Sequence, residues 1–431
     1  MMSSKNHIKN FGATDSSVSE IETPQEGIMN SPQNLFPGEE ATEGDTSSIA
    51  FQNESFLPPM PTAVAALAGA DLNCDLDARQ AFLEDGGSTV STCFRVANIL
   101  HTHAHFSEAA AFYLRSMQLH SGNPTEFPSV YTLLQVRLLC LLKSGQDIAD
   151  EELERLRSLH IPYANYISGI RLAWRQNNLR GALEKIGSAY DEFHTGEEAD
   201  WQILQIAKRI EPSLFTPDRQ EEGKRIPSAL YMYWDNNPPP EIQNNFDLHS
   251  TLPGMPLKIF NKDEAQEWLY DIYGVEARNL FLQMRHPAEA ADFLRLHVTQ
   301  TLGGWWLDAD LRVSGSVALK KMISEPAQNA FFLTDNGMVH NDFYGTVPNS
   351  EIVSDALLSV YRNCYLFPNL YIAFKTGPGP LTRALNRTAH KSLNGLRPTQ
   401  TIAIYDQHDF KKIIEEFDTP YKHSLPNWQN V

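Results

Sequence analysis

The chain has 431 residues, enough for two or three domains with at least one sizeable core. It carries 53 acidic and 35 basic residues and a formal net charge of −18, without basic clusters, which argues against binding to nucleic acid or to anionic membranes. No stretch reaches the roughly 18–20 apolar residues that span a bilayer, and the first residues lack the apolar core of a secretory signal. We therefore predict a cytoplasmic protein of bacterial type without a transmembrane segment. Secretion by a pathway that does not use such a signal stays an alternative.

The first part of the chain predicts little ordered structure. Residues 1–60 are rich in Ser, Asn, Glu, Gly and Pro and hold few large apolar side chains. Such a segment buries too little apolar surface to offset the entropy of ordering it, so we predict a disordered tail. Residues 61–87 begin with an alanine-rich stretch and predict a linker or a short helix.

Residues 88–215 have a helical pattern, because apolar residues recur there at spacings of three and four. Within this range, residues 104–113 resemble the entry to the second helix of a tetratricopeptide repeat, in which small residues let two helices pack closely. A weaker echo follows at residues 177–186, about two 34-residue periods later. We predict an all-α domain of tetratricopeptide-like repeats, which could bind a protein partner or pack against the next domain.

Residues 224–431 have the pattern of an α/β domain. Residues 229–234 are an aromatic-rich run typical of a strand, closed by a proline-rich loop, and residues 255–261 and 302–310 predict two further strands. Amphipathic helices are predicted between them, at residues 262–273 and 288–301. Ligands of such sheets gather at the carboxyl ends of the strands.

Two carboxylates, Asp308 and Asp310, end the third predicted strand. Such a pair can share one divalent cation, and hard cations bridge the phosphate oxygens of nucleotides. Most chains of this size contain an Asp-x-Asp by chance. Here Asp292 and Arg295 lie a short way upstream on one helix face; alone they would indicate a surface ion pair, but beside the Asp-x-Asp they favour a functional site. The pattern predicts metal-assisted chemistry on a diphosphate.

Three ordered blocks of the sequence, at residues 226–234, 291–295 and 303–310, resemble one glycosyltransferase family. It is the family with a DXD sugar-binding region (family 32-like), which shares its core with mannosyltransferases, bacterial capsule enzymes and clostridial glucosylating toxins. The resemblance covers residues 224–431. It implies a GT-A-type fold with a Rossmann-like mixed sheet, and transfer of a sugar from a UDP- or GDP-sugar, with retention, to an acceptor on a polysaccharide, glycolipid or protein.

The resemblance also implies roles for individual residues. Asp310 would bind Mn or Mg, and Asp308 would contact the ribose or a metal-bound water. Asp292 and Arg295 would hold donor-sugar hydroxyls and a phosphate oxygen, for which the planar guanidinium is suited. The remaining candidates are Trp234 to stack on the base with Tyr233 as its backup, Asn341 near the donor, Asp342 to orient the acceptor or to form an Asx turn, His423 to complete the metal shell and Trp428 to cover the diphosphate.

Two other functions stay open. One is a catalytically inactive adaptor that uses its helical repeats to bind a partner. The other is a metal-dependent nucleotidyl or phosphoryl transferase, which would also use Asp308 and Asp310. In its commonest form that class carries the phosphate-binding loop G-x-x-x-x-G-K-[ST], which this sequence lacks.

Overall fold

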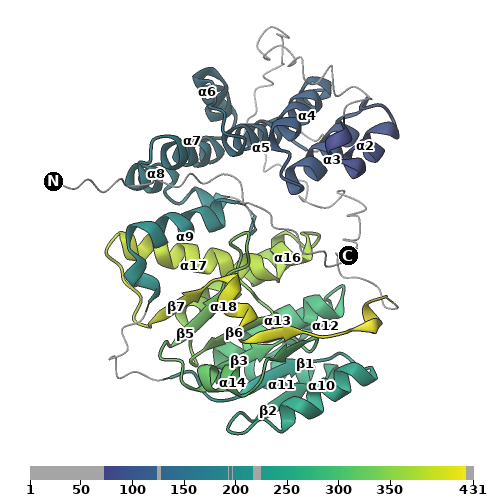
Figure 1. Ribbon diagram of the computed structural model, residues 1–431, viewed down its shortest axis with the longest axis vertical. Coiled ribbons are helices and arrows are strands. Elements are labelled where there is room, and N and C mark those ends of the chain that lie inside the picture. Colours follow the sequence, from purple (N-terminus) through teal and green to yellow (C-terminus); the bar gives the residue numbers. More distant parts are fainter. Residues whose placement is uncertain (1–71, 124–127, 193, 197, 217–224, 424–431) are drawn as a thin grey trace, which may run out of the picture.

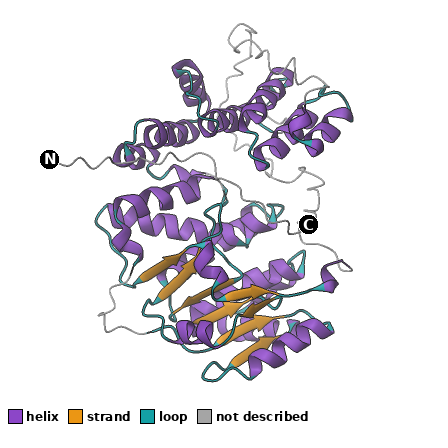
Figure 2. Ribbon diagram, viewed as in Figure 1, coloured by secondary structure: helices purple, strands orange, loops and turns teal. Residues whose placement is uncertain are grey.

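The computed structural model describes residues 72–123, 128–192, 194–196, 198–216 and 225–423. The predicted disordered tail lies outside the described residues, as does the beginning of the predicted linker. The described chain forms a helical part followed by a sheet with helices on both faces (Figures 1 and 2). The predicted class, an α/β part with a mixed sheet preceded by helices, is therefore confirmed. The domain boundaries and the repeat family stay predictions.

The helical part consists of consecutive helices with short connections. Side chains begin several of them: Thr89 and Ser129 each accept a hydrogen bond from the backbone N–H three residues on, which satisfies a donor that the helix leaves free. The helices are α2 (Leu76–Leu83), α3 (Val90–Thr102), α4 (Phe106–Leu119), α5 (Val130–Lys143), α6 (Asp150–Leu159), α7 (Ile161–Arg175), α8 (Leu179–Ile186) and α9 (Glu198–Ile210).

This helical part has an apolar core of its own, built mainly from α3, α4, α5 and α7. Helix α7 packs closely on α8 because it presents Gly169, where an added Cβ would lie only 2.3 Å from the Cγ1 of Ile186. Helix α9 belongs to two clusters: Ile203 packs in the helical core, while Leu204 packs against the sheet.

The sheet has six strands in the order β2-β1-β3-β6-β5-β7, and β6 runs antiparallel to both of its neighbours. A separate antiparallel pair joins β4 to β8. The strands are β1 (Leu230–Tyr233), β2 (Leu257–Phe260), β3 (Gly304–Leu307), β4 (Leu311–Val313), β5 (Asn329–Phe332), β6 (Phe343–Thr346), β7 (Ile402–Tyr405) and β8 (Ile414–Glu416). The first three were predicted from the sequence; the later strands were not.

The sheet is the middle of three layers, because alternate side chains of each strand enter different cores. Tyr231 and Trp306 pack on one face, under α9, α11 (Lys262–Tyr273), α12 (Val275–Leu282), α13 (Pro287–Leu302), α15 (Glu351–Leu366) and α17 (Pro378–Leu393). Met232 and Trp305 pack on the other, under α10 (Pro240–Ser250), α14 (Ser316–Ile323) and α18 (Gln407–Lys411). Both tryptophans of the third strand are thus core residues.

The third predicted strand begins later than its pattern suggests. Leu302 is the last residue of α13, and Gly303 ends the helix at a φ of 65°. A Cβ on Gly303 would lie 2.6 Å from the Cδ of Pro348, so both the backbone conformation and the close neighbour require glycine. The Gly-Gly turn therefore carries the chain directly from α13 into β3.

A buried ion pair joins the helical part to the sheet part. Arg383 of α17 donates through Nε to Asp200 of α9 over 2.9 Å, and both side chains are almost completely inaccessible to solvent. The other oxygen of Asp200 accepts the Gly196 N–H at 3.0 Å, and Arg383 also donates to the His194 carbonyl. The pair thus fixes α9 and the segment before it on α17.

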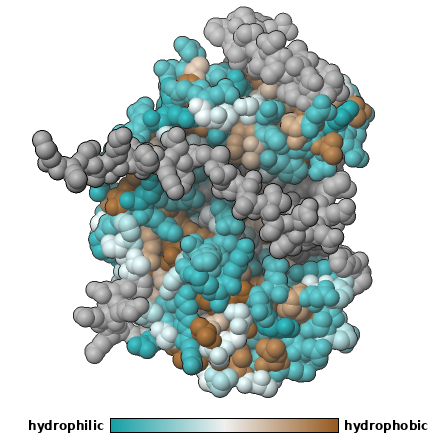
Figure 3. Space-filling model, viewed as in Figure 1, coloured by the Kyte–Doolittle hydropathy of each residue, from teal (hydrophilic) through white to brown (hydrophobic). Residues whose placement is uncertain are grey.

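No helix among the described ranges is long and apolar enough to cross a membrane. On the face shown in Figure 3, hydrophobic residues lie in small separate groups among hydrophilic ones. Scattered exposed apolar residues of this kind are normal for a folded surface and do not define a binding patch.

We expect the Asp200→Asn substitution to lower the free energy of unfolding by about 3 kcal/mol or more, because it leaves the Arg383 charge buried without its counterion. Urea unfolding of the full chain followed by circular dichroism measures this loss. The control is Glu154→Gln, which breaks the exposed pair of Glu154 with Arg157 and should cost less than about 1 kcal/mol. Equal small losses in both variants would contradict the structural role of the pair.

Candidate active site at the carboxyl edge of the sheet

The sheet topology gathers the candidate residues at one edge. β1 and β3 are parallel, so Trp234 and Asp308 follow their strands at the same edge. β6 runs the opposite way, and Phe343 at its start pairs with Leu307 at the end of β3. Asn341 and Asp342 therefore lie beside the Asp-x-Asp, and the Asp308 N–H donates to the Asp342 carbonyl over 2.9 Å.

Arg295 of α13 lies at the centre of this edge, with only 3% of its side chain exposed. Its Nη2 lies 2.8 and 3.0 Å from the two oxygens of Asp308 and 3.1 Å from Asp292, and its Nη1 donates to the Asn341 carbonyl at 2.6 Å. Its Nε is buried and has no hydrogen-bond partner among the described residues. Both Nη atoms thus contact protein groups, and Arg295 holds α13, β3 and the segment before β6 together.

Three groups of the protein contact the buried carboxylate of Asp292. Asn341 donates from Nδ2 at 2.8 Å, the Thr376 hydroxyl donates at 3.1 Å, and Arg295 supplies the opposite charge. Burial raises the pKa of Asp292 to about 6, although Arg295 acts in the opposite direction. A buried carboxyl with a raised pKa beside a charged partner is typical of functional sites.

Asp308 is oriented from two sides. Besides Arg295, the indole Nε1–H of Trp306 donates to it over 2.7 Å. Burial raises the pKa of the Asp308 carboxyl, Arg295 opposes this, and the neighbouring carboxylates raise the pKa further. About a quarter of the side chain, 26%, stays exposed, so a bound ligand could still reach this carboxylate.

Asp310 faces the C-terminal turn Pro420–His423 rather than the core. The Tyr421 hydroxyl donates to its Oδ2 at 3.3 Å, and the Lys422 ammonium lies 2.9 Å from the same oxygen. The ring of Tyr421 also meets Trp234 edge to face, with 5.1 Å between the ring centroids. The C-terminal turn therefore connects Trp234 with Asp310.

Asp308 and Asp310 fit a divalent cation in the kind of donor they offer. Hard cations take carboxylate oxygens, and Oδ1 of Asp310 has no hydrogen-bond partner among the residues described. The Lys422 ammonium on Oδ2 shows that this carboxylate already attracts a cation. Asp308 has fewer oxygen lone pairs free for a cation, because Arg295 and Trp306 already donate hydrogen bonds to its carboxylate.

A different group of side chains in the helical part could also hold a cation. Asp75, Asp77 and His103 bring their ligand atoms within 4.8 Å of one another. Asp75 is already committed, since it accepts the Ala78 N–H at the start of α2 and pairs with His103 at 2.6 Å. Within the described ranges this is the only group of three or more such residues that meets this spacing, and it lies in the helical part, not at the sheet edge.

The predicted site residues fall into four sets. Asp292, Arg295, Asp308, Asn341 and Asp342 contact one another directly or through the backbone. Asp310 and Trp234 form a second set, because both contact Tyr421. Tyr233 is different: it is buried, packs against Phe281 and donates to Asp235 at 2.7 Å, a position that does not favour stacking on a base. Trp428 and the side chain of His423 lie outside the described residues.

Four residues at this edge were not among the predicted site residues: Thr376, Tyr421, Lys422 and His340. The ring nitrogens of His340 lie 3.0 Å from Asp342 Oδ1 and 2.6 Å from Gln407 Oε1, and the ring stacks on Phe410. Burial lowers the pKa of His340, but the hydrogen bonds to Asp342 and Gln407 and the charges of Asp342 and Asp335 together outweigh burial, so that the pKa is raised. The available signal for His340, Tyr421 and Lys422 was their place within two positions of a predicted candidate.

We expect the Lys422→Met substitution to tighten Mn²⁺ binding to the full chain about threefold to tenfold, because it removes a competing cation from Asp310. Free Mn²⁺ measured by electron paramagnetic resonance gives the affinity without any substrate. The matched control is Lys412→Met, since Lys412 is similarly exposed and lies at the same 2.9 Å distance from Asp409, away from this edge. Unchanged or weaker binding in the Lys422 variant would refute competition at Asp310.

The raised pKa of Asp292 should appear in the pH dependence of stability. Because the folded state holds this proton more tightly than the unfolded chain, Asp292 contributes stability at low pH that is lost as the pH rises towards about 6. Between pH 7.5 and pH 5 the wild type should gain about 1 kcal/mol more than Asp292→Asn. Urea unfolding at the two pH values measures the difference, and parallel profiles would contradict the assignment.

Comparisons with known proteins name no family for this chain. No family model matches the sequence, and no curated protein matches it. One solved structure, titled PaToxG Glycosyltransferase, is similar over 46% of this chain and 87% of its own length, with 16% sequence identity and a TM-score of 0.32. A likeness at this TM-score carries no argument about fold or activity, so the function rests on the geometry of the site.

Proposed function

We propose that residues 225–423 form a GT-A-type glycosyltransferase that moves a sugar from a nucleoside diphosphate sugar to an acceptor hydroxyl or other nucleophile, with help from Mn or Mg. The observation that carries the proposal is the convergence of Asp292 and Asp308 on the buried guanidinium of Arg295 at the sheet edge. Together with Asp310, they place three carboxylates where ligands of α/β sheets bind.

In this proposal Asp310 holds the cation and Asp308 supports it or the ribose. The bound cation would neutralise the charge that builds on the leaving diphosphate. Trp234, beside Tyr421, is the stacking residue for the base, while Tyr233 is set aside. Lys422 must leave Oδ2 of Asp310 for a cation to use that oxygen, and its charge is then free to approach a phosphate.

The proposed role of Arg295 differs from the one that the family resemblance implies. Its Nη groups are bonded to Asp308, Asp292 and the Asn341 carbonyl, and its Nε is buried. We therefore assign Arg295 as a positioning residue that fixes the carboxylates, rather than as a direct phosphate ligand. In the proposed complex the Asp292 carboxylate accepts a hydrogen bond from one hydroxyl of the donor sugar, and the Asn341 amide donates one to another. Asp342, which is hydrogen-bonded to His340, would orient the acceptor substrate.

The adaptor alternative is not favoured. The four charged residues that the family resemblance calls for, Asp292, Arg295, Asp308 and Asp310, are all present in this chain. The first three contact one another at the sheet edge, which speaks against a decayed site. Retention of configuration, the identity of the acceptor and recruitment of a protein through the helical part remain parts of the proposal that follow from the family resemblance.

Hydrolysis of a panel of UDP- and GDP-sugars with Mn or Mg tests the proposal. We expect slow, metal-dependent cleavage of one donor by the full chain, and a loss of about 100-fold or more in Asp308→Ala/Asp310→Ala, because charge on the diphosphate is then unopposed. Asp263→Ala, an exposed carboxylate on α11, is the control and should keep the wild-type rate.

Two results would count against a glycosyltransferase. If the double variant still cleaves the donor, the activity does not depend on Asp308 and Asp310. No cleavage of any donor, together with no thermal stabilisation by UDP or GDP in the presence of Mn, would show that the protein binds no nucleotide-sugar donor. The inactive adaptor would then be the favoured function.

A further inference from the structure

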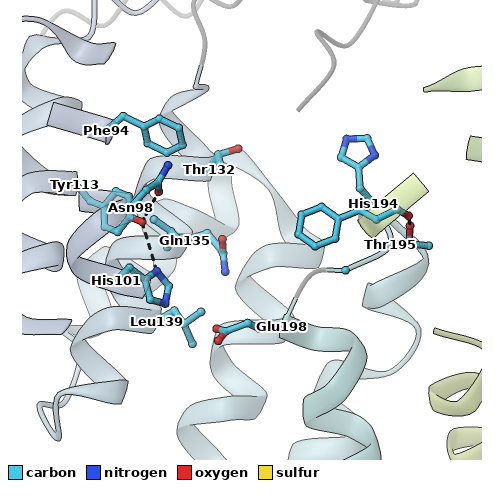
Figure 4. Close-up of a pocket in the computed structure, with 13 residues that line it drawn as sticks. Phe94, Asn98, His101, Tyr113, Thr132, Gln135, Leu139, His194, Thr195 and Glu198 are labelled. Atoms are coloured by element: carbon cyan, nitrogen blue, oxygen red, sulfur yellow. Dashed lines mark hydrogen bonds between the residues drawn. The ribbon is translucent and has the colours of Figure 1, made fainter. Parts of the chain in front are cut away.

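A cavity of about 220 Å³ lies between the helical part and the sheet part, away from the carboxyl edge (Figure 4). Helices α3, α4 and α5 form one wall. The segment before α9 and Phe374 of the short helix α16 (Ile372–Lys375) form the other. Most of the lining is apolar, and its main apolar members are Phe94, Val136, Leu139 and Phe374.

Gln135 of α5 gives this cavity a polar centre. The residue is 3% exposed as a whole, and its amide has no hydrogen-bond partner among the described residues. Figure 4 shows the amide pointing into the space between α5 and the segment that carries Thr195. Both the donor and the acceptor of this amide are therefore available to a molecule in the cavity.

The polar groups around Gln135 leave further hydrogen-bonding capacity unused. Tyr113 donates to Oδ1 of Asn98 at 2.7 Å, which leaves the Nδ2 of Asn98 without a partner in the described chain. Glu198 accepts Lys143 on Oε1, while its Oε2 is buried and unpaired among the described residues. The cavity thus offers an N–H donor, a carboxylate acceptor and a complete amide.

Charge is balanced at this site. The ammonium of Lys143 pairs with Glu198 and donates to Nε2 of His101 at 2.9 Å. Burial, with Lys143 acting in the same direction, lowers the pKa of His101 to about 3, so the ring is neutral at pH 7. A ligand with net charge would meet no uncompensated partner here.

We propose that this cavity is a second ligand site, for a small neutral ring that carries an amide or amide-like edge, the chemistry of nicotinamide and of the nucleobases. The ring would lie among Phe94, Val136 and Phe374, and its edge would pair with the Gln135 amide. The size agrees with one ring, because drug-sized ligands fill cavities of about 300–1,000 Å³. The site does not depend on glycosyl transfer.

Calorimetric titration of the full chain with nicotinamide, benzamide, adenine and uracil tests the proposal, with toluene as the ring that lacks an amide. We expect at least one amide probe to bind with a Kd of about 1 mM or tighter, and toluene to bind more weakly. Gln135→Leu should weaken the amide probe about tenfold or more, since it removes the paired donor and acceptor. Gln266→Leu, at a half-buried position of α11 outside the cavity lining, is the control and should bind as the wild type does.

Thermal unfolding of the same variants supplies a second readout. Gln135→Leu should raise Tm, because an amide that has no partner in the protein and faces a mostly apolar cavity is replaced by an apolar side chain of similar size. Binding of no probe to the wild type at 10 mM, about ten times the expected Kd, would overturn the proposal. Equal binding to wild type and Gln135→Leu would also overturn it, since the Gln135 amide would then not contact the probe. A fall in Tm would overturn it as well, since the amide would then have a partner inside the protein.

Discussion

The buried guanidinium of Arg295 is the constraint on which the sheet edge depends. A charge taken out of water must be paired and hydrogen-bonded, and here the partners come from α13 itself, from the end of β3 and from the backbone before β6. Because Arg295 is rigidly held, Asp292 and Asp308 are held with it. The candidate site is therefore built on regular elements, which position side chains more accurately than loops do.

The helical part and the candidate site share structural elements. Phe374 lines the cavity against the helical part, Lys375 pairs with the buried Glu289 of α13 at 2.8 Å, and Thr376 donates to Asp292. Three consecutive residues thus touch the cavity, the helix that carries Arg295 and a candidate donor-binding carboxylate. The Asp200–Arg383 pair fixes α9 on the same side of the sheet. Figure 1 shows α16 and α17 between the helical part and the sheet.

The sequence predicted those parts of the site that lie close together in the chain. Regular periodicity located α11, α13 and the first three strands. The Asp-x-Asp pattern and the family resemblance gave Asp292, Arg295, Asp308 and Asp310 as candidates, and their roles stay predictions. The sequence did not predict the direction of β6, because a short buried strand does not reveal whether it runs parallel or antiparallel to its neighbours. The antiparallel direction of β6 brings Asn341 and Asp342 to the edge. The spacing of residues also could not show that Arg295 donates hydrogen bonds to Asp308, or that Lys422 forms an ion pair with Asp310. Both contacts join residues that lie apart in the sequence. Gln135 reads in the sequence as an ordinary residue of a helix; only packing reveals its unpaired amide.

The most direct test of one shared site for cation and donor is the position of Mn²⁺ in crystals of the full chain grown with UDP or GDP, measured by anomalous diffraction. We expect a Mn²⁺ ion bonded to the Asp310 carboxylate, close to Asp308, with the diphosphate on the same ion and Lys422 displaced from Oδ2. A Mn²⁺ ion at Asp75, Asp77 and His103 with the sheet edge empty would contradict it.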